Sequence, residues 1–228
     1  MENLVENISK SVAIELLFEE MPTRPTANAI FREARKIFGD INIINRDENN
    51  IEFSVNKFVA YNEDNTTSPV VLAMGNITDF DDKVAVSEFE RTQIWNVANS
   101  EELLSKYKYA VKIWDVNAQR QIPKERAIML VDWLNVALKL YPKCQAIWIK
   151  SAGKLQLAQS IKNLKETGIV KYLYSMVNIR FFNVPNTNEF IVDSVGLANI
   201  GLSDVQFHFK GMNPNKVANL AYSLARYI

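Results

Sequence analysis

The sequence contains only one cysteine and one histidine in 228 residues, Cys144 and His208. A single cysteine cannot form a disulfide within the chain, and one histidine with one cysteine is too few for an ordinary zinc site. We therefore expect neither a metal nor a cofactor. The absence of a disulfide framework also fits a reducing compartment, so we expect a cytoplasmic protein.

Several other signatures are missing. Glycine and proline number seven each, which argues against fibrous or low-complexity character. No apolar run approaches the roughly 20 residues that span a bilayer, and Met1–Leu4 lacks the start of a secretory signal. The sequence has no glycine-rich phosphate loop, dinucleotide fingerprint or nucleophile elbow. We therefore expect no membrane contact and none of the enzyme classes that these motifs mark.

Net charge is zero over the whole chain, but it is distributed unevenly. Residues 1–114 hold 19 acidic and 12 basic side chains, and residues 115–228 hold 7 acidic and 14 basic ones. The two halves thus carry net charges of −7 and +7. Such a distribution can steer a charged partner, and it equally fits two halves that pack together with solvated charges.

Hydrophobic periodicity predicts alternating strands and helices. Thr26 and Gly39 are a helix N-cap and C-cap by residue type, and Pro123 and Pro214 suit the first turn of a helix. The predicted strands are 12–18, 41–44, 51–61, 69–77, 109–116, 145–149, 177–184, 190–192 and 205–209. The predicted helices are 27–38, 85–98, a short helix after Ser100, 124–140, 152–165 and 214–227.

This order of elements predicts an α+β fold with mixed sheets and helices packed on one face. Two ferredoxin-like units are one arrangement that fits. We expect an N-terminal lobe of residues 1–116 and a C-terminal lobe of residues 117–228, closely packed enough to count as one domain.

A row of alternate polar residues begins at Asp204 and runs along the predicted strand 205–209. Side chains alternate along a strand, so Asp204, Gln206 and His208 share one face and Val205, Phe207 and Phe209 share the other. The row could line a cleft in which His208 acts as acid or base, with Asp204 or Asp193 as its partner. More often such a row is the solvated face of a strand or a hydrogen-bonded set that fixes a loop.

Two features could contact a partner protein. An acidic cluster has five acids within twelve residues: Asp79, Asp81, Asp82, Glu88 and Glu90. Trp133 lies on a second apolar stripe of the helix 124–140, which indicates either a helix buried on two sides or a docking surface. Lysines interleave with aromatic residues over 139–174, a weak signature for nucleic acid, which we do not expect as a partner. A homo-oligomer fits the composition.

The C-terminal part carries a family resemblance. The pattern Asp193-Ser194-x-Gly196-Leu197, then Gly201-Leu202-x-Asp204-x-Gln206-x-His208-Phe209, then Asn213-Pro214-x-x-Val217 resembles the bacterial domain-of-unknown-function family 4261. The strand Val177–Asn183, Gln93-x-Trp95 and Ala146-Ile147-Trp148 are similar to it too, so the resemblance runs over about residues 11–228.

The resemblance implies a small cytoplasmic bacterial protein, and it supplies no catalytic residues. Members near secretion-system or toxin–immunity genes imply a protein-binding module with an immunity or secretion-accessory role. That is our leading hypothesis. The alternative is an enzyme that acts on a small molecule at a cleft lined by Asp204, Gln206 and His208. A concave pocket holding these three would favour the enzyme, whereas a flat apolar or strongly charged patch would favour the binding module.

Overall fold

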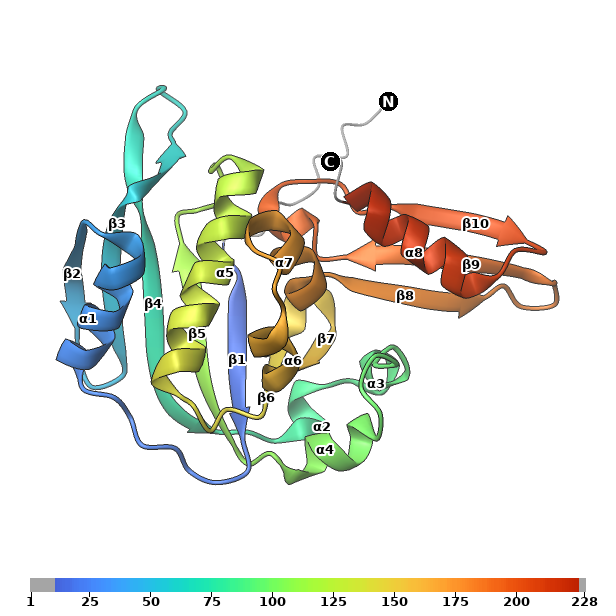
Figure 1. Cartoon of the computed structure of the whole chain (residues 1–228), viewed down its shortest axis with the longest axis horizontal. Coiled ribbons are helices and arrows are strands. Elements are labelled where there is room, and N and C mark those ends of the chain that lie inside the picture. Colours follow the sequence, from blue (N-terminus) through green and yellow to red (C-terminus); the bar gives the residue numbers. More distant parts are fainter. Residues whose placement is uncertain (1–10, 226–228) are drawn as a thin grey trace.

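Two antiparallel sheets form the framework of the computed structural model, which describes residues 11–225 (Figure 1). The large sheet is seven-stranded. In spatial order it contains β2 (Ile41–Arg46), β3 (Asn50–Tyr61), β4 (Thr67–Asp79), β5 (Tyr109–Val116), β1 (Ala13–Phe18), β6 (Ala146–Ile149) and β7 (Lys154–Leu157). The small sheet contains β10 (Gln206–Lys210), β9 (Glu189–Val195) and β8 (Asn178–Asn183). The α+β class is confirmed.

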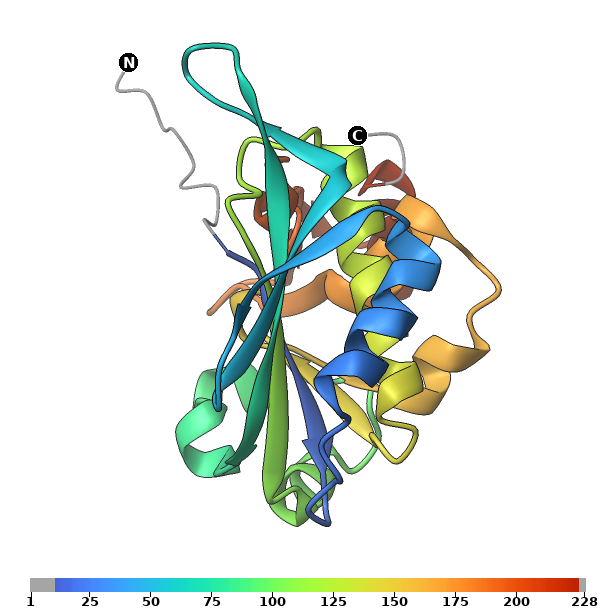
Figure 2. The same ribbon diagram turned by 90° about the vertical axis from the view of Figure 1, so that its left-hand side faces the viewer.

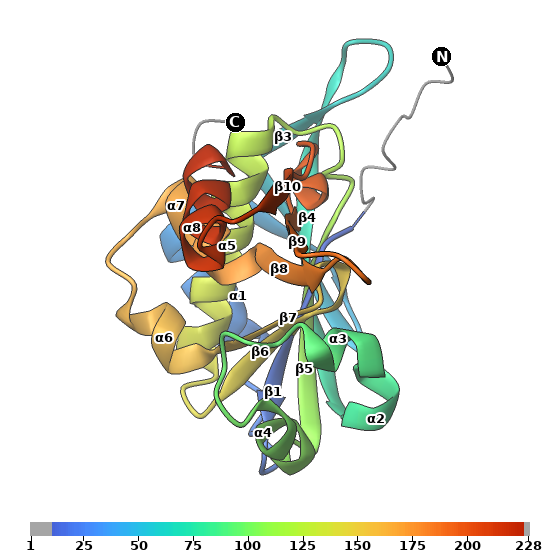
Figure 3. The ribbon, with the colours of Figure 1, turned by 90° about the vertical axis from the view of Figure 1, so that its right-hand side faces the viewer.

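Helices cover both faces of the large sheet. The helices on one side are α1 (Ala27–Phe38), α5 (Pro123–Leu140), α6 (Ala158–Asn163) and α7 (Gly168–Met176). The short helices α2 (Asp82–Ala85), α3 (Glu88–Thr92) and α4 (Ser100–Lys106) lie on the opposite side (Figure 3). They enclose a second core with Leu17, Trp148 and Leu155. The expectation of helices on one face only is therefore wrong, because Leu17 of β1, Ala146 and Trp148 of β6 and Leu155 of β7 give the sheet an apolar surface on this second side too.

Helix α5 is the centre of the main core. It begins with Pro123 at its first position and packs on the same face of the sheet as α1 and α7, which flank it (Figure 2). Both of its apolar stripes are buried, and Trp133 is 0% exposed. The Trp133 indole N–H donates to the Ala73 carbonyl at 3.1 Å, and its ring meets Phe38 and Phe53. The prediction that Trp133 contacts a partner is wrong, since this residue belongs to the core.

The small sheet stands beside the large one and carries α8 (Pro214–Ala225) on one face (Figure 1). Ile179, Val192 and Val217 join the same buried cluster as α5, so the two sheets share a continuous core. Strands from both sides of residue 117 lie in the large sheet, which therefore does not divide there. The break between the sheets comes after β7. Two ferredoxin-like units are not formed, because β1 pairs with β5 and β6.

Two predicted helices are wrong. Residues 85–98 instead contain the last residue of α2, then α3 and turns, because Ser87 and Glu90 form a capping box that starts a new helix. Residues 152–165 begin with a turn that ends at Gly153, where φ is +56°, so the chain reverses into β7 before α6 begins. Helix α7 was not predicted at all.

No helix among residues 11–225 combines the length and apolar character needed to cross a membrane. Within the same residues, no three or more His, Cys, Asp or Glu side chains form a group able to hold a metal ion. Cys144 is a buried free thiol, and burial raises its pKa to about 12. The described part of the chain thus presents neither a reactive thiolate nor a metal cluster.

Candidate functional site

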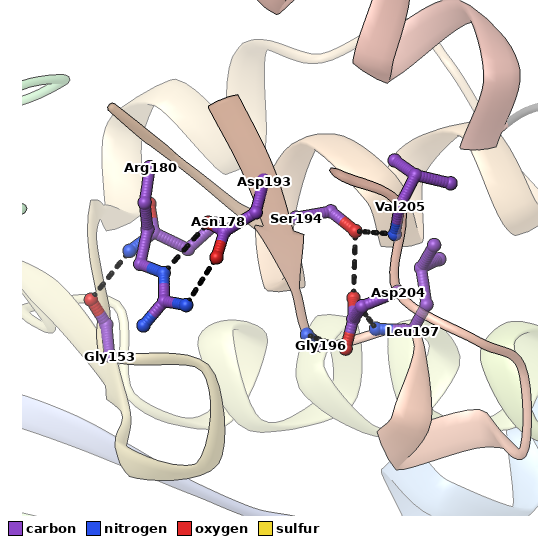
Figure 4. A network of polar contacts seen from close by, with 9 residues as sticks. All are labelled: Gly153, Asn178, Arg180, Asp193, Ser194, Gly196, Leu197, Asp204 and Val205. Atoms are coloured by element: carbon purple, nitrogen blue, oxygen red, sulfur yellow. Dashed lines mark hydrogen bonds and ion pairs between the residues drawn. The ribbon is translucent and has the colours of Figure 1, made fainter. Parts of the chain in front are cut away.

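The predicted polar row does not converge on one space. Asp204 precedes β10 and turns toward the loop after β9, where its carboxylate accepts from Ser194 Oγ at 2.8 Å and from the backbone N–H of Leu197 at 3.0 Å and Gly196 at 3.3 Å (Figure 4). Ser194 Oγ in turn accepts from the Val205 N–H at 2.9 Å. Asp204 therefore fixes the entry to β10 through a closed set of hydrogen bonds.

The loop that Asp204 holds is tightly packed. Gly196 has φ of +127°, and a Cβ there would lie 2.8 Å from the Met176 carbonyl oxygen. The Gly196 carbonyl also accepts from the buried Tyr172 hydroxyl at 2.7 Å. Glycine is required at this position by backbone conformation and by space. Asp204, Ser194 and Gly196 therefore fix the loop after β9, although their place in the sequence pattern made them candidates for a site.

His208 and Gln206 are exposed on the outer face of β10. His208 Nε2 lies 2.8 Å from Glu189 Oε2, with the histidine side chain 58% exposed. Asp193 lies on the central strand β9 and pairs with Arg180, whose Nε and Nη2 donate at 2.9 and 2.5 Å (Figure 4). This hydrogen bond raises the pKa of the Arg180 guanidinium. The four residues therefore occupy three different environments.

The acidic cluster is largely engaged in its own fold. Asp81 accepts from the Lys83 N–H at 3.0 Å as the N-cap of α2, and Asp82 pairs with Arg91 at 2.8 Å. Glu90 Oε2 accepts from the N–H and hydroxyl of Ser87 at 2.8 and 2.6 Å. Asp79 and Glu88 are exposed. The cluster thus consists of two helix-capping carboxylates, one carboxylate in an ion pair and two remaining surface carboxylates.

A cleft does occur where α3 approaches the small sheet. Its first part, here the apolar pocket, has a volume of about 350 Å³ and is lined mainly by Trp95, Ile179, Phe181, Val192, Pro214 and Ala218. The Trp95 indole N–H donates to the Ile179 carbonyl at 2.9 Å, while 52% of the residue stays exposed. A large aromatic surface is therefore held rigidly at the mouth of this pocket.

The second part, here the polar pocket, has a volume of about 360 Å³. Its polar lining is Ser87, Glu90, Gln93, Lys150, Ser151, Asn178 and Arg180. Asn178 Nδ2 donates to the Gly153 carbonyl at 2.9 Å (Figure 4). Ser151 Oγ accepts from Asn199 Nδ2 at 3.0 Å. Arg180 lies over the Phe182 ring, 5.2 Å from its centroid. These contacts fix the walls before any ligand arrives.

Gln93 and Arg180 line both pockets, so the two form one feature, here called the edge cleft. Gln93 is 8% exposed, and its Nε2 donates to Thr92 Oγ1 at 3.2 Å. Its Oε1 is buried and has no hydrogen-bond partner among the described residues. A buried acceptor without a donor costs about 1–3 kcal/mol.

Few ionisable side chains line the edge cleft. Its cations are Lys150 and Arg180, its one lining carboxylate is that of Glu90, and neither the histidine nor the cysteine lines it. The sequence had marked Gln93, Trp95 and the strand around Arg180 only as parts of a resemblance. The neighbouring glutamine and tryptophan were the signal that the sequence offered. It did not connect them with the strand around Arg180, because Trp95 and its hydrogen-bond partner Ile179 are 84 residues apart.

Comparison with known proteins bears on the C-terminal part. Neither the curated proteins nor the solved structures gave a match. One family model matches, over residues 193–228, which runs from within β9 through β10 and α8. The resemblance predicted over residues 11–228 is thus confirmed for this stretch. Residues 193–228 are similar to the family described as Domain of unknown function (DUF4261).

Proposed function

We propose that this chain is a non-enzymatic protein-binding module whose partner places a segment in the edge cleft. The observation that carries the proposal is Trp95, which lines the apolar pocket, is 52% exposed and is fixed by its hydrogen bond to the Ile179 carbonyl. An exposed, fixed tryptophan is typical of the residues that dominate binding energy in protein interfaces.

The alternative, an enzyme acting at Asp204, Gln206 and His208, has less support. That hypothesis needs three side chains around one reacting group. Asp204 is occupied by the loop that it holds, and Gln206 and His208 project from the outer face of β10. A binding role requires only the preformed walls of the edge cleft.

The cellular part of the proposal is a bacterial cytoplasmic protein that serves as an immunity protein or a secretion-system accessory. It rests on the resemblance of the tail to the family. The buried, single Cys144 is compatible with a reducing compartment. In either role the protein would act by forming a stoichiometric complex.

Affinity capture from the native host with the full chain tests the proposal. Wild type, Trp95→Ala and Tyr61→Ala serve as baits, and bound proteins are quantified by mass spectrometry. Tyr61 is the matched control, since it is an aromatic residue 45% exposed at the end of β3. We expect one protein to be captured in stoichiometric amount by wild type and Tyr61→Ala and lost with Trp95→Ala.

The captured protein is then purified and titrated calorimetrically into the three baits. We expect Trp95→Ala to weaken its binding at least tenfold, because a central aromatic anchor contributes about 2 kcal/mol or more. Equal capture by all three baits, or no stoichiometric capture at all, would show that the edge cleft is not a protein-binding site.

A further inference from the structure

The outer edge of β8 lies in the edge cleft. β8 is the last strand of the small sheet, with β9 as its only neighbour in that sheet. In an antiparallel strand the N–H and C=O of one residue point to the same side, and successive residues alternate. The Val184 N–H donates to the Glu189 carbonyl, so the backbone N–H and C=O groups of Arg180 and Phe182 also point toward β9. The backbone N–H and C=O groups of Ile179, Phe181 and Asn183 therefore point away from β9, toward the outer edge.

Two other hydrogen bonds agree with this orientation. Ser194, opposite Ile179, donates its N–H to Val205 on the far side of β9, not to β8. The Ile179 carbonyl accepts from the Trp95 indole, which lies outside the sheet. No described residue pairs with the outward N–H and C=O groups of Phe181 and Asn183. An unpaired row of this kind is a template for another strand.

The two pockets lie where the side chains of an added strand would point. Ile179 and Phe181 belong to the core under α8 and line the apolar pocket. Asn178 and Arg180 project to the other face, where they line the polar pocket. Successive side chains of a strand alternate between the faces of its sheet. A strand placed beside β8 would therefore send alternate side chains into an apolar and a polar environment.

We infer that an extended segment of the partner protein adds to the small sheet as a fourth strand beside β8. Main-chain hydrogen bonds to Phe181 and Asn183 hold the segment, and pockets on the two faces select its side chains, as in other cases of strand addition. An apolar side chain enters the apolar pocket against Trp95. This inference deepens the proposed function and rests on it.

Charge indicates the chemistry of the alternate side chain. The polar pocket holds two cations, of which Arg180 is paired with Asp193 and Lys150 makes no ion pair among the described residues. The Glu90 carboxylate accepts from the N–H and hydroxyl of Ser87. An acidic side chain of the segment would lie beside Lys150. The partner segment is thus an extended peptide with an apolar and an acidic residue at alternating positions.

A peptide selected from a random 12-residue library on the immobilised full chain serves as the probe. Backbone amide exchange of the chain is measured by NMR with and without it. In the free chain we expect the Phe181 and Asn183 amides to exchange fast and those of Arg180 and Phe182 slowly. Saturating peptide should slow Phe181 and Asn183 at least tenfold, because each N–H gains an acceptor.

A variant pair checks the same edge by affinity. Asn183→Pro removes one outward N–H at the end of β8, and Asn183→Ala keeps it. We expect Asn183→Pro to weaken peptide binding at least fivefold and Asn183→Ala to leave it within twofold. Melting curves establish that both variants fold, and the exchange experiment needs no variant.

The outcomes separate the two proposals. Peptide binding that Trp95→Ala abolishes, with unchanged exchange at Phe181 and Asn183, overturns strand addition and leaves the proposed function. Binding that Trp95→Ala does not affect, or a library that yields no binder, counts against both. Slow exchange of both amides in the free chain that depends on its concentration identifies a second copy of the chain as the occupant, and overturns the inference.

Discussion

Lys154 gives the sharpest prediction about stability. It lies in β7, is 2% exposed, and its Nζ donates to the Val177 carbonyl at 2.5 Å, just before β8. Burial lowers its pKa to about 7, against about 10.4 in an unfolded chain. Between these values the unfolded chain holds a proton that the folded chain has released. The free energy of unfolding therefore rises with pH in this window and is lowest below pH 7.

The magnitude follows from the same two pKa values. Each pH unit inside the window changes the free energy by about 1.4 kcal/mol, so the penalty is about 4 kcal/mol at pH 7 and about 2 kcal/mol less at pH 9. Lys154→Met removes the buried ammonium but leaves the Val177 carbonyl without its donor, which costs about 1–3 kcal/mol. The variant should thus be about 1–3 kcal/mol more stable than wild type at pH 7, and should lose about 2 kcal/mol of that advantage by pH 9.

Urea unfolding of both proteins at pH 7, 8 and 9, followed by circular dichroism, measures this difference. Taking wild type against variant at each pH cancels groups that titrate equally in both, such as the thiol of Cys144. If the variant is less stable than wild type by the same amount at all three pH values, burial does not lower the pKa of Lys154 and the prediction is wrong.

The remaining predictions concern the core and the loop after β9. Gly196→Ala should lower the free energy of unfolding by about 2 kcal/mol or more, from φ of +127° and the 2.8 Å approach to Met176, and a melting curve should shift downward by about 4–8 °C. Trp133→Ala should cost about 3–5 kcal/mol in urea unfolding, and Trp95→Ala, at an exposed position, markedly less. An equal cost would place Trp133 at the surface. His208→Ala should change stability by less than about 1 kcal/mol and leave partner capture unchanged. Loss of capture with an unchanged melting curve would give His208 a functional role.

Local signals in the sequence predicted the elements that depend on them. Thr26 and Gly39 bound α1 as expected, because a cap acts on the nearest turn of its own helix. Strand β5 matches its predicted range 109–116, and α5 begins at Pro123 as expected. Helix α8 begins at Pro214 as expected, and Asn213 Oδ1 accepts from the N–H groups of Asn215 and Lys216 in its first turn.

The errors come from contacts that are distant in sequence. Residues 154–157 were predicted as part of the helix 152–165, but they form β7 because they pair with β6. A charged residue, Lys154, at a buried strand position does not favour a strand in the sequence pattern. Of the alternatives for the polar row, the cleft is not formed, because Asp204 turns back to bond the loop at Gly196. The edge cleft forms where the segment around Trp95 meets β8, and no local pattern links those two parts of the chain.

Hydrogen–deuterium exchange of the full chain with its captured partner tests whether the edge cleft binds that partner. We expect slower exchange in two segments, residues 87–95 and 178–183, which form the opposite sides of the edge cleft. We expect unchanged exchange across residues 79–84, the start of the acidic cluster. Protection confined to residues 79–84, with no change at 178–183, would place the partner on the acidic surface and rule out binding in the edge cleft.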